Sequence, residues 1–302
     1  MQDERSGQSR TGSAKPGQRY TILERSGGAG RPSPGELADR DPLLSTRLDD
    51  GGYRALCFVA GDILNMAFDA TFAHDVLVPL NTTAYQLSWG QQLRFPPGWQ
   101  QTGTVTVDQS TIDRETASGL AKILISEDCD WGVVARKDDI SVIAIRGTDT
   151  RHQWIEDFRA IAQPIPHGAW WIHRGFDDVW NSIAASLQKA WDTASSANAK
   201  VYITGHSLGA ALALIMGVNH PEAFTWTFAG PAVFSPIHGV PPAGNIVRVV
   251  NPGDLVPKVP IPPLYQHIGQ EVDVAAAANP TDLALQHSLD TCAAGLLKLM
   301  GH

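Results

Sequence analysis

The stretch VYITGHSLGAALAL, residues 201–214, constrains the fold more than any other part of the chain. An apolar strand-like run leads directly into glycine, serine and glycine at positions 205, 207 and 209, and an apolar helix-like run follows. When a strand turns directly into a helix around a serine, the serine is held in a strained turn, and the flanking glycines let the two backbones approach each other. The pattern therefore predicts a nucleophile elbow.

Ser207 is the expected nucleophile of this elbow. It precedes a helix N-terminus, where unpaired backbone N–H groups and the helix dipole favour a developing negative charge. The N–H of Leu208 is therefore expected to donate one hydrogen bond of an oxyanion hole. The alternative interpretation is a glycine turn before a buried helix, and the strand, the helix and the downstream partners together disfavour it.

The remainder of the chain alternates strand-like and helix-like segments. The runs WGVVAR and ISVIAIRGT are separated by residues 137–139 and predict a β-hairpin. The other expected strands are VYIT, FTWTFAG and NIVRVV, with helices near 54–68, 151–161, 175–195 and 282–299, and irregular structure over 75–105. Alternating strands and helices predict an α/β fold in which a mostly parallel sheet is covered by helices on both faces.

The 302 residues, 43% of them hydrophobic, are enough for one catalytic domain with a tail. Residues 1–50 are rich in Gly, Ser, Pro, Arg and Asp, which is typical of a flexible or draped extension. We therefore expect an extension over 1–50, in which YTIL could form a short strand, and a single domain over 51–302.

The net charge of -8 argues against nucleic acid as a partner, because nucleic-acid binding usually needs a concentrated basic face. The three cysteines, Cys57, Cys129 and Cys292, show neither CxxC nor metal-ligand spacing, so buried free thiols are expected and no metal site. Residues 1–20 lack the apolar run of a secretory signal, and no segment is long and apolar enough to span a membrane. A cytoplasmic location is the expectation that follows.

The acid of a serine triad in this fold should follow the nucleophile in the sequence, and the base should follow the acid. Asp254, in VVNPGDLVPKVP, directly follows an apolar strand, which places its carboxylate at the carboxyl edge of the sheet. A local turn-forming role is the alternative for this residue. The competing acids, which no strand precedes, are Asp273, Asp282 and Asp290.

The sequence pattern alone does not decide which histidine is the catalytic base. The late histidines are His220, His238, His267, His287 and His302. His287 precedes the last helical stretch, whereas His267 lies in the strand-like YQHIGQEV. Periodicity leaves the choice between these two open, because a lone histidine is often structural.

Five motifs in order resemble the fungal-type, or class 3, triacylglycerol lipases over roughly residues 115–300. They are SVIAIRGT, HQWIEDF, IHRGFDDVW, YITGHSLGAALA and RVVNPGDLVPKVP. The resemblance implies an α/β-hydrolase fold with a short helical lid. It also implies that QHSLD carries the catalytic histidine, His287, and that Thr148 completes the oxyanion hole with Leu208. The chain departs from the family at SPIHGVPPAGN, which is shorter and proline-rich.

The segment DTRHQWIEDFRAI is the expected lid. Trp154, Phe158 and Ile161 fall at i, i+4 and i+7 and share one helical face, and Ile155 lies beside them in the lid motif. A helix of this kind could cover the site in water and move aside at an apolar interface. An ordinary surface helix packed on the core is the alternative.

Together these features predict a triacylglycerol lipase or carboxylesterase that acts through an acyl-enzyme and needs no cofactor. The expected partner is a lipid or other ester substrate, and a lipid–water interface is one place where the enzyme could bind it. Phospholipase A1 and feruloyl-type esterase are the alternatives within the same machinery, since fold alone does not choose among substrates. A noncatalytic lipase-like binding protein is the alternative outside it.

Overall fold

The structure is a computed structural model of the whole chain. It describes residues 69–107, 130–148, 163–196, 199–260, 262–274 and 281–301, and four short strands before residue 56. The chain separates into two compact units, residues 1–62 and residues 63–302.

The described part of the first unit consists of two antiparallel strand pairs. β1 (Gly12–Ser13) pairs with β2 (Arg19–Tyr20), and β3 (Ser45–Arg47) pairs with β4 (Tyr53–Ala55). The expected strand YTIL therefore begins in β2, and its remaining residues lie outside the described part. The helix expected near 54–68 is wrong at its start, because the first two of its residues pair in β4, and its other residues are not described.

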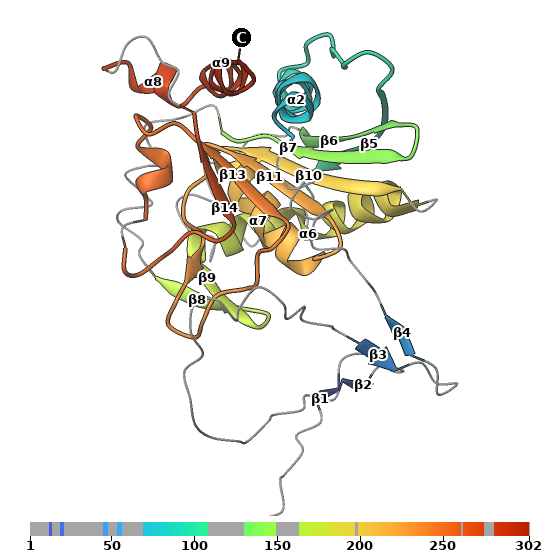
Figure 1. Ribbon diagram of the computed structural model, residues 1–302, viewed down its shortest axis with the longest axis vertical. Coiled ribbons are helices and arrows are strands. Elements are labelled where there is room, and N and C mark those ends of the chain that lie inside the picture. The colour runs from blue at the N-terminus through green and yellow to red at the C-terminus, as the bar shows by residue number, and fades with distance from the viewer. Residues whose placement is uncertain are drawn as a thin grey trace, which may run out of the picture. The chain divides into compact units, whose positions relative to one another are not determined.

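A seven-stranded sheet forms the centre of the second unit (Figure 1). Its order is β14-β13-β11-β10-β7-β6-β5, in which β7, β10, β11, β13 and β14 run parallel and β6 is antiparallel to both of its neighbours. The strands are β5 (Gln100–Thr106), β6 (Asp130–Lys137), β7 (Ile140–Ile145), β10 (Lys200–His206), β11 (Phe224–Phe228), β13 (Ile246–Val250) and β14 (Gln270–Asp273). The expected hairpin is β6–β7, and the mostly parallel sheet is confirmed.

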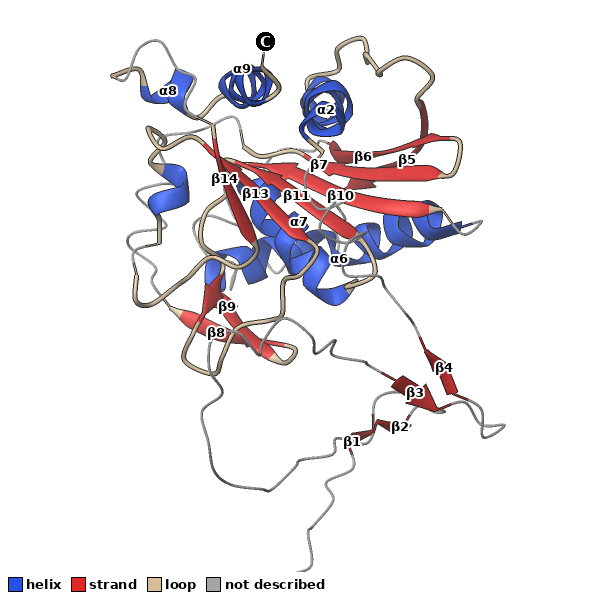
Figure 2. Cartoon of the chain, in the orientation of Figure 1, coloured by secondary structure: helices blue, strands red, loops and turns tan. Residues whose placement is uncertain are grey.

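Helices cover both faces of this sheet (Figures 1 and 2). The long α6 (Arg174–Ser195) and the apolar α7 (Leu208–Asn219) pack on one face, and α3 (Val78–Ser88) and α9 (Leu289–Leu299) pack on the other. Because side chains alternate along a strand, Ile143 and Ile145 of β7 enter the first core, while Val142 and Ala144 enter the second. This two-sided burial explains why the sheet strands are continuously apolar.

The irregular structure expected over 75–105 is wrong. This stretch holds most of a continuous helix, formed by α2 (Ala70–Phe72), the π-helical turn Ala73–Leu77 and α3, and it ends in β5. Pro79 suggests a break, but it lies inside this helix, at the point where the π-helical turn passes into α3. Only residues 89–99 between α3 and β5 are irregular.

Smaller elements surround the carboxyl edge of the sheet. β8 (Pro164–His167), β9 (Trp170–His173) and β12 (Phe234–Ser235) form a separate three-stranded sheet, and a 3₁₀ turn occupies Val256–Lys258. The helix expected at 282–299 is divided into α8 (Leu283–Gln286) and α9. Within the described ranges, no helix has the length and apolar character needed to cross a membrane.

Candidate active site

Ser207 lies in a strained turn between β10 and α7. Its backbone angles are φ 59° and ψ -123°, a conformation that residues other than glycine rarely adopt. The flanking glycines make the turn possible: a Cβ on Gly205 would lie 2.1 Å from the carbonyl oxygen of Gly209, and one on Gly209 would lie 2.2 Å from that of Ile145. The predicted elbow is therefore present, and at its two glycines the neighbouring backbone segments lie too close together to admit a side chain.

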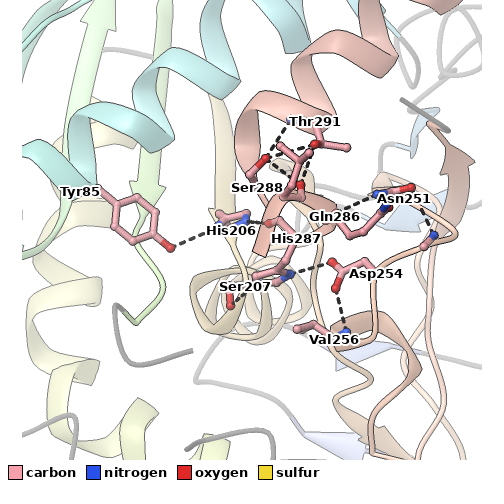
Figure 3. Close-up of polar contacts among 12 residues, drawn as sticks. Tyr85, His206, Ser207, Asn251, Asp254, Val256, Gln286, His287, Ser288 and Thr291 are labelled. Carbon is pink, nitrogen blue, oxygen red and sulfur yellow. Dashed lines mark hydrogen bonds and ion pairs between the residues drawn. The ribbon is translucent and has the colours of Figure 1, made fainter. Parts of the chain in front are cut away.

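Ser207, His287 and Asp254 form a hydrogen-bonded chain (Figure 3). His287 Nε2 lies 2.9 Å from Ser207 Oγ, and His287 Nδ1 lies 2.7 Å from Asp254 Oδ2. Their exposed fractions are 2% for Ser207, 4% for His287 and 2% for Asp254. Because a carboxylate only accepts, Nδ1 carries the proton, and the neutral imidazole then offers Nε2 as the acceptor for the serine hydroxyl.

Asp254 reaches this chain from the loop that follows β13. Its second oxygen, Oδ1, accepts a hydrogen bond of 2.9 Å from the backbone N–H of Val256, which fixes the plane of the carboxylate. The three competing acids lie elsewhere. Asp273 ends β14, Asp282 caps α8 by accepting from the N–H of Leu285, and Asp290 lies in the first turn of α9.

His287 lies at the break between α8 and α9. Ser288 is the N-cap of α9 and accepts a hydrogen bond from the N–H of Thr291, so the second helix begins directly after the histidine. His267, the competing base, lies outside the triad, and its Nε2 donates to the carbonyl of Pro257 at 2.6 Å. Burial and then the nearby Arg248 charge lower the pKa of His267.

Two further contacts connect the segments that carry the triad, and the sequence analysis missed both. Asn251 donates through Nδ2 to the backbone and side-chain oxygens of Gln286, which joins the loop of Asp254 to the residue before His287. His206, next to the serine, bonds through Nε2 to the carbonyl of His287. Asn251 is close to Asp254 in the sequence, but Gln286 is 35 residues away, so spacing could not have revealed the pair.

The oxyanion-hole candidates are Leu208, which directly follows the serine, and Thr148. Leu208 is the first residue of α7 and is fully buried. Thr148 is 4% exposed, and its hydroxyl has no hydrogen-bond partner among the described residues. The loop before Thr148 passes close to the serine, because a Cβ on Gly147 would lie 2.8 Å from Ser207 Cβ. The expected lid residues Trp154, Ile155, Phe158 and Ile161 lie outside the described residues.

The described residues contain no cluster of three His, Cys, Asp or Glu side chains able to hold a metal ion. Cys292 is a buried free cysteine, and burial, together with the Asp254 charge, raises the pKa of its thiol to about 12. It is therefore a protonated core residue at neutral pH. Cys57 and Cys129 are not among the described residues.

The fold is that of an α/β-hydrolase. Helices cover both faces of a mostly parallel sheet, and a strained serine lies between a strand and a helix. An aspartate and then a histidine follow the serine in the sequence and join it in the hydrogen-bonded chain. Residues 142–263 match the family Lipase (class 3). This part of the chain is similar to the class 3 lipases.

Similar proteins include fungal and plant enzymes. "Secreted mono- and diacylglycerol lipase 1" of Fusarium solani is 29% identical over 150 residues, which cover 45% of this chain and 44% of that protein. A chloroplastic phospholipase A(1) of Arabidopsis thaliana is 29% identical over 176 residues, which cover 46% of this chain and 38% of that protein. The solved structure of the Lip2 lipase from Yarrowia lipolytica has 18% identity and a TM-score of 0.48, and the match covers 77% of this chain and 83% of that one.

The chain spans about half the length of the curated relatives that it matches. The expected cytoplasmic location is wrong, because relatives from Fusarium solani and Penicillium cyclopium are both named as secreted enzymes. That expectation depended on the absence of a signal in residues 1–20, of which only two short strands are described.

Proposed function

We propose that this protein is a serine hydrolase that cleaves carboxylic esters of lipids through an acyl-enzyme on Ser207. The chain of hydrogen bonds from Ser207 through His287 to Asp254 is the single observation that carries the proposal. A serine hydroxyl is a weak nucleophile until a neutral imidazole accepts its proton. His287 is oriented for this task, and all three groups are buried.

In the proposed reaction, Ser207 Oγ attacks the ester carbonyl carbon while its proton passes to His287 Nε2. Asp254 stabilises the imidazolium, and the backbone N–H groups of Leu208 and Thr148 bind the oxyanion of the tetrahedral intermediate. His287 then gives the proton to the departing alcohol oxygen, which leaves an ester on Ser207. Water attacks this ester, its proton passes through His287 to Ser207, and the free acid departs.

Lipid esters are the proposed substrates. Exposed leucines flank two members of the triad in sequence: Leu255 follows Asp254, and Leu283 and Leu285 precede His287, with exposed fractions of 36%, 45% and 37%. Such side chains suit contact with acyl chains or with a lipid–water interface better than contact with a polar substrate. The relatives named as mono- and diacylglycerol lipase and as phospholipase A(1) support the same class of substrate.

Hydrolysis of p-nitrophenyl esters from acetyl to palmitoyl tests the proposal. We expect the wild type to be active and Ser207→Ala to fall at least about 10³-fold. Ser141→Ala is the matched control, because Ser141 is also buried and its hydroxyl has no partner among the described residues. Equal activity in Ser207→Ala and wild type would refute the nucleophile. A folded wild type inactive on every ester would favour the noncatalytic binding protein.

A second set of assays separates the lipid classes. Triacylglycerol, diacylglycerol and phosphatidylcholine dispersions distinguish a lipase from a phospholipase A1. Raising the substrate concentration through its solubility limit tests the proposed lid of Trp154, Ile155, Phe158 and Ile161. We expect the rate to rise abruptly once an interface forms, and a smooth hyperbola would contradict gating by a lid.

A further inference from the structure

The hydroxyl of Tyr85 lies between two segments that the reaction needs, and Figure 3 shows its contact with one of them, at His206. Tyr85 belongs to α3, far from the triad in the sequence. Its oxygen accepts a hydrogen bond of 2.9 Å from the backbone N–H of Gly147, in the loop that carries Thr148. The same hydroxyl lies 2.8 Å from Nδ1 of His206, the residue before Ser207.

The direction of each bond follows from what the groups can donate. His206 Nε2 faces the carbonyl oxygen of His287 at 2.8 Å, and a carbonyl only accepts, so Nε2 carries the proton. In the neutral imidazole Nδ1 is then the acceptor, and the Tyr85 hydroxyl donates to it. One phenol therefore links the Gly147 amide to the His206 ring and, through that ring, to the backbone of His287.

Packing fixes this phenol in place. Tyr85 is 8% exposed, and its ring meets the His206 ring edge-on with centroids 5.8 Å apart. A Cβ on Gly147 would lie only 2.6 Å from the Tyr85 hydroxyl oxygen and 2.8 Å from both the His206 carbonyl oxygen and Ser207 Cβ. Glycine at position 147 lets the loop approach the phenol, and the phenol gives the loop its hydrogen-bond partner.

We propose that Tyr85 is a positioning residue for the oxyanion hole and for His287, a role that rests on the proposed serine hydrolase function. Its hydroxyl orients the Gly147 peptide, and the Thr148 N–H follows directly in the chain. Through His206, it also holds the backbone carbonyl of His287. Its effect therefore concerns the transition state, where the oxyanion forms, more than the binding of the ground-state ester.

Tyr85→Phe removes only the hydroxyl and keeps the ring. Tyr265→Phe is the matched control, because Tyr265 is fully buried and its hydroxyl has no partner among the described residues. Both variants are assayed on p-nitrophenyl butyrate below its solubility limit. An alkylboronic acid, which forms a tetrahedral adduct with an active serine, is titrated as the inhibitor. Thermal unfolding establishes a temperature at which both variants are folded.

Tyr85→Phe loses both hydrogen bonds of the hydroxyl, to Gly147 and to His206. We expect kcat to fall about tenfold and boronate binding to weaken about tenfold, with KM within about twofold. In Tyr265→Phe all three values should stay within about twofold of wild type. A kcat and boronate affinity in Tyr85→Phe equal to those of the control would overturn the proposal, as would a rise in KM at constant kcat.

If Tyr85→Phe does not fold, His206→Phe takes its place, because phenylalanine keeps a ring but makes neither hydrogen bond of His206. We expect the same losses in kcat and boronate binding, and wild-type values would overturn the proposal. Ser207→Ala separates this inference from the function on which it rests. An active Ser207→Ala removes the proposed nucleophile. An inactive Ser207→Ala beside a fully active Tyr85→Phe overturns the role of Tyr85 alone.

Discussion

In the proposed reaction Asp254 acts only through His287, because its Oδ2 accepts a hydrogen bond from the imidazole Nδ1. Asn has the same shape as Asp, but its amide can donate to Nδ1 and thereby hold the wrong tautomer, with the proton on Nε2. We expect Asp254→Asn to lower kcat by roughly 10³- to 10⁴-fold at neutral pH with little loss of stability. Ester hydrolysis and thermal unfolding check this, with Asp290→Asn as the control. More than a tenth of wild-type activity in Asp254→Asn would contradict the assignment.

His267 provides a prediction about pH and stability. Its folded pKa is lowered, chiefly by burial, whereas its unfolded pKa is about 6.5. The unfolded chain therefore takes up a proton that the folded protein resists, and this contribution to stability falls as the pH drops below about 6.5. Gln can still donate to the Pro257 carbonyl but does not titrate.

We expect the advantage of the wild type over His267→Gln in the free energy of unfolding to be smaller at pH 5 than at pH 8. Urea denaturation at the two pH values measures it. An advantage that stays constant or grows on acidification would contradict a neutral folded His267.

At the scale of the residue, the sequence pattern predicts the candidate residues that follow recognisable strands. Ser207 and Asp254 were predicted because each lies at the end of an apolar run, and His287 required the family resemblance, since its neighbours alone left His267 equally open. Tyr85 and Gln286 were not predicted. They reach the site through tertiary contacts across 121 and 35 residues, which leave no local pattern.

The elbow has no room for an added methyl group at its glycines. Alanine at Gly209 would place Cβ 2.2 Å from a backbone oxygen of β7, which cannot move without displacing the strand. We expect Gly209→Ala to lower the free energy of unfolding by about 3 kcal/mol or more. Gly244→Ala is the control, because nothing lies within 4 Å of its added Cβ, and its change should be within about 0.5 kcal/mol. Equal unfolding midpoints in urea would refute the close crossing.

Among the elements, the buried strands and α6 were predicted well because their apolar periodicity is strong. The error over 75–105 has a definite cause, because Pro79 and the pair Pro96-Pro97 are residues that usually interrupt helices and strands. The first lies in the opening turn of α3, and the pair occupies the connection between α3 and β5. The proline pair therefore marks an irregular connection correctly, whereas Pro79 lies within a continuous helix.

In the whole molecule, the sheet, both hydrophobic cores and the triad are formed by residues of the second unit, 63–302. We therefore propose that this unit is the catalytic domain and that the first residues are an extension to it. A chain beginning at Ile63 should keep kcat on p-nitrophenyl butyrate within about twofold and its unfolding temperature within a few degrees of the full chain. A truncated chain that is insoluble or inactive would show that residues 1–62 belong to the catalytic fold.

The central claim is that Ser207 is an activated nucleophile, and covalent labelling tests it most directly. The wild-type protein is incubated with an alkyl fluorophosphonate, and the mass of the intact chain and of its peptides is measured. We predict one adduct per chain, on the peptide that contains Ser207, and none in Ser207→Ala or after denaturation. An unlabelled native protein, or an adduct that persists in Ser207→Ala, would contradict the account.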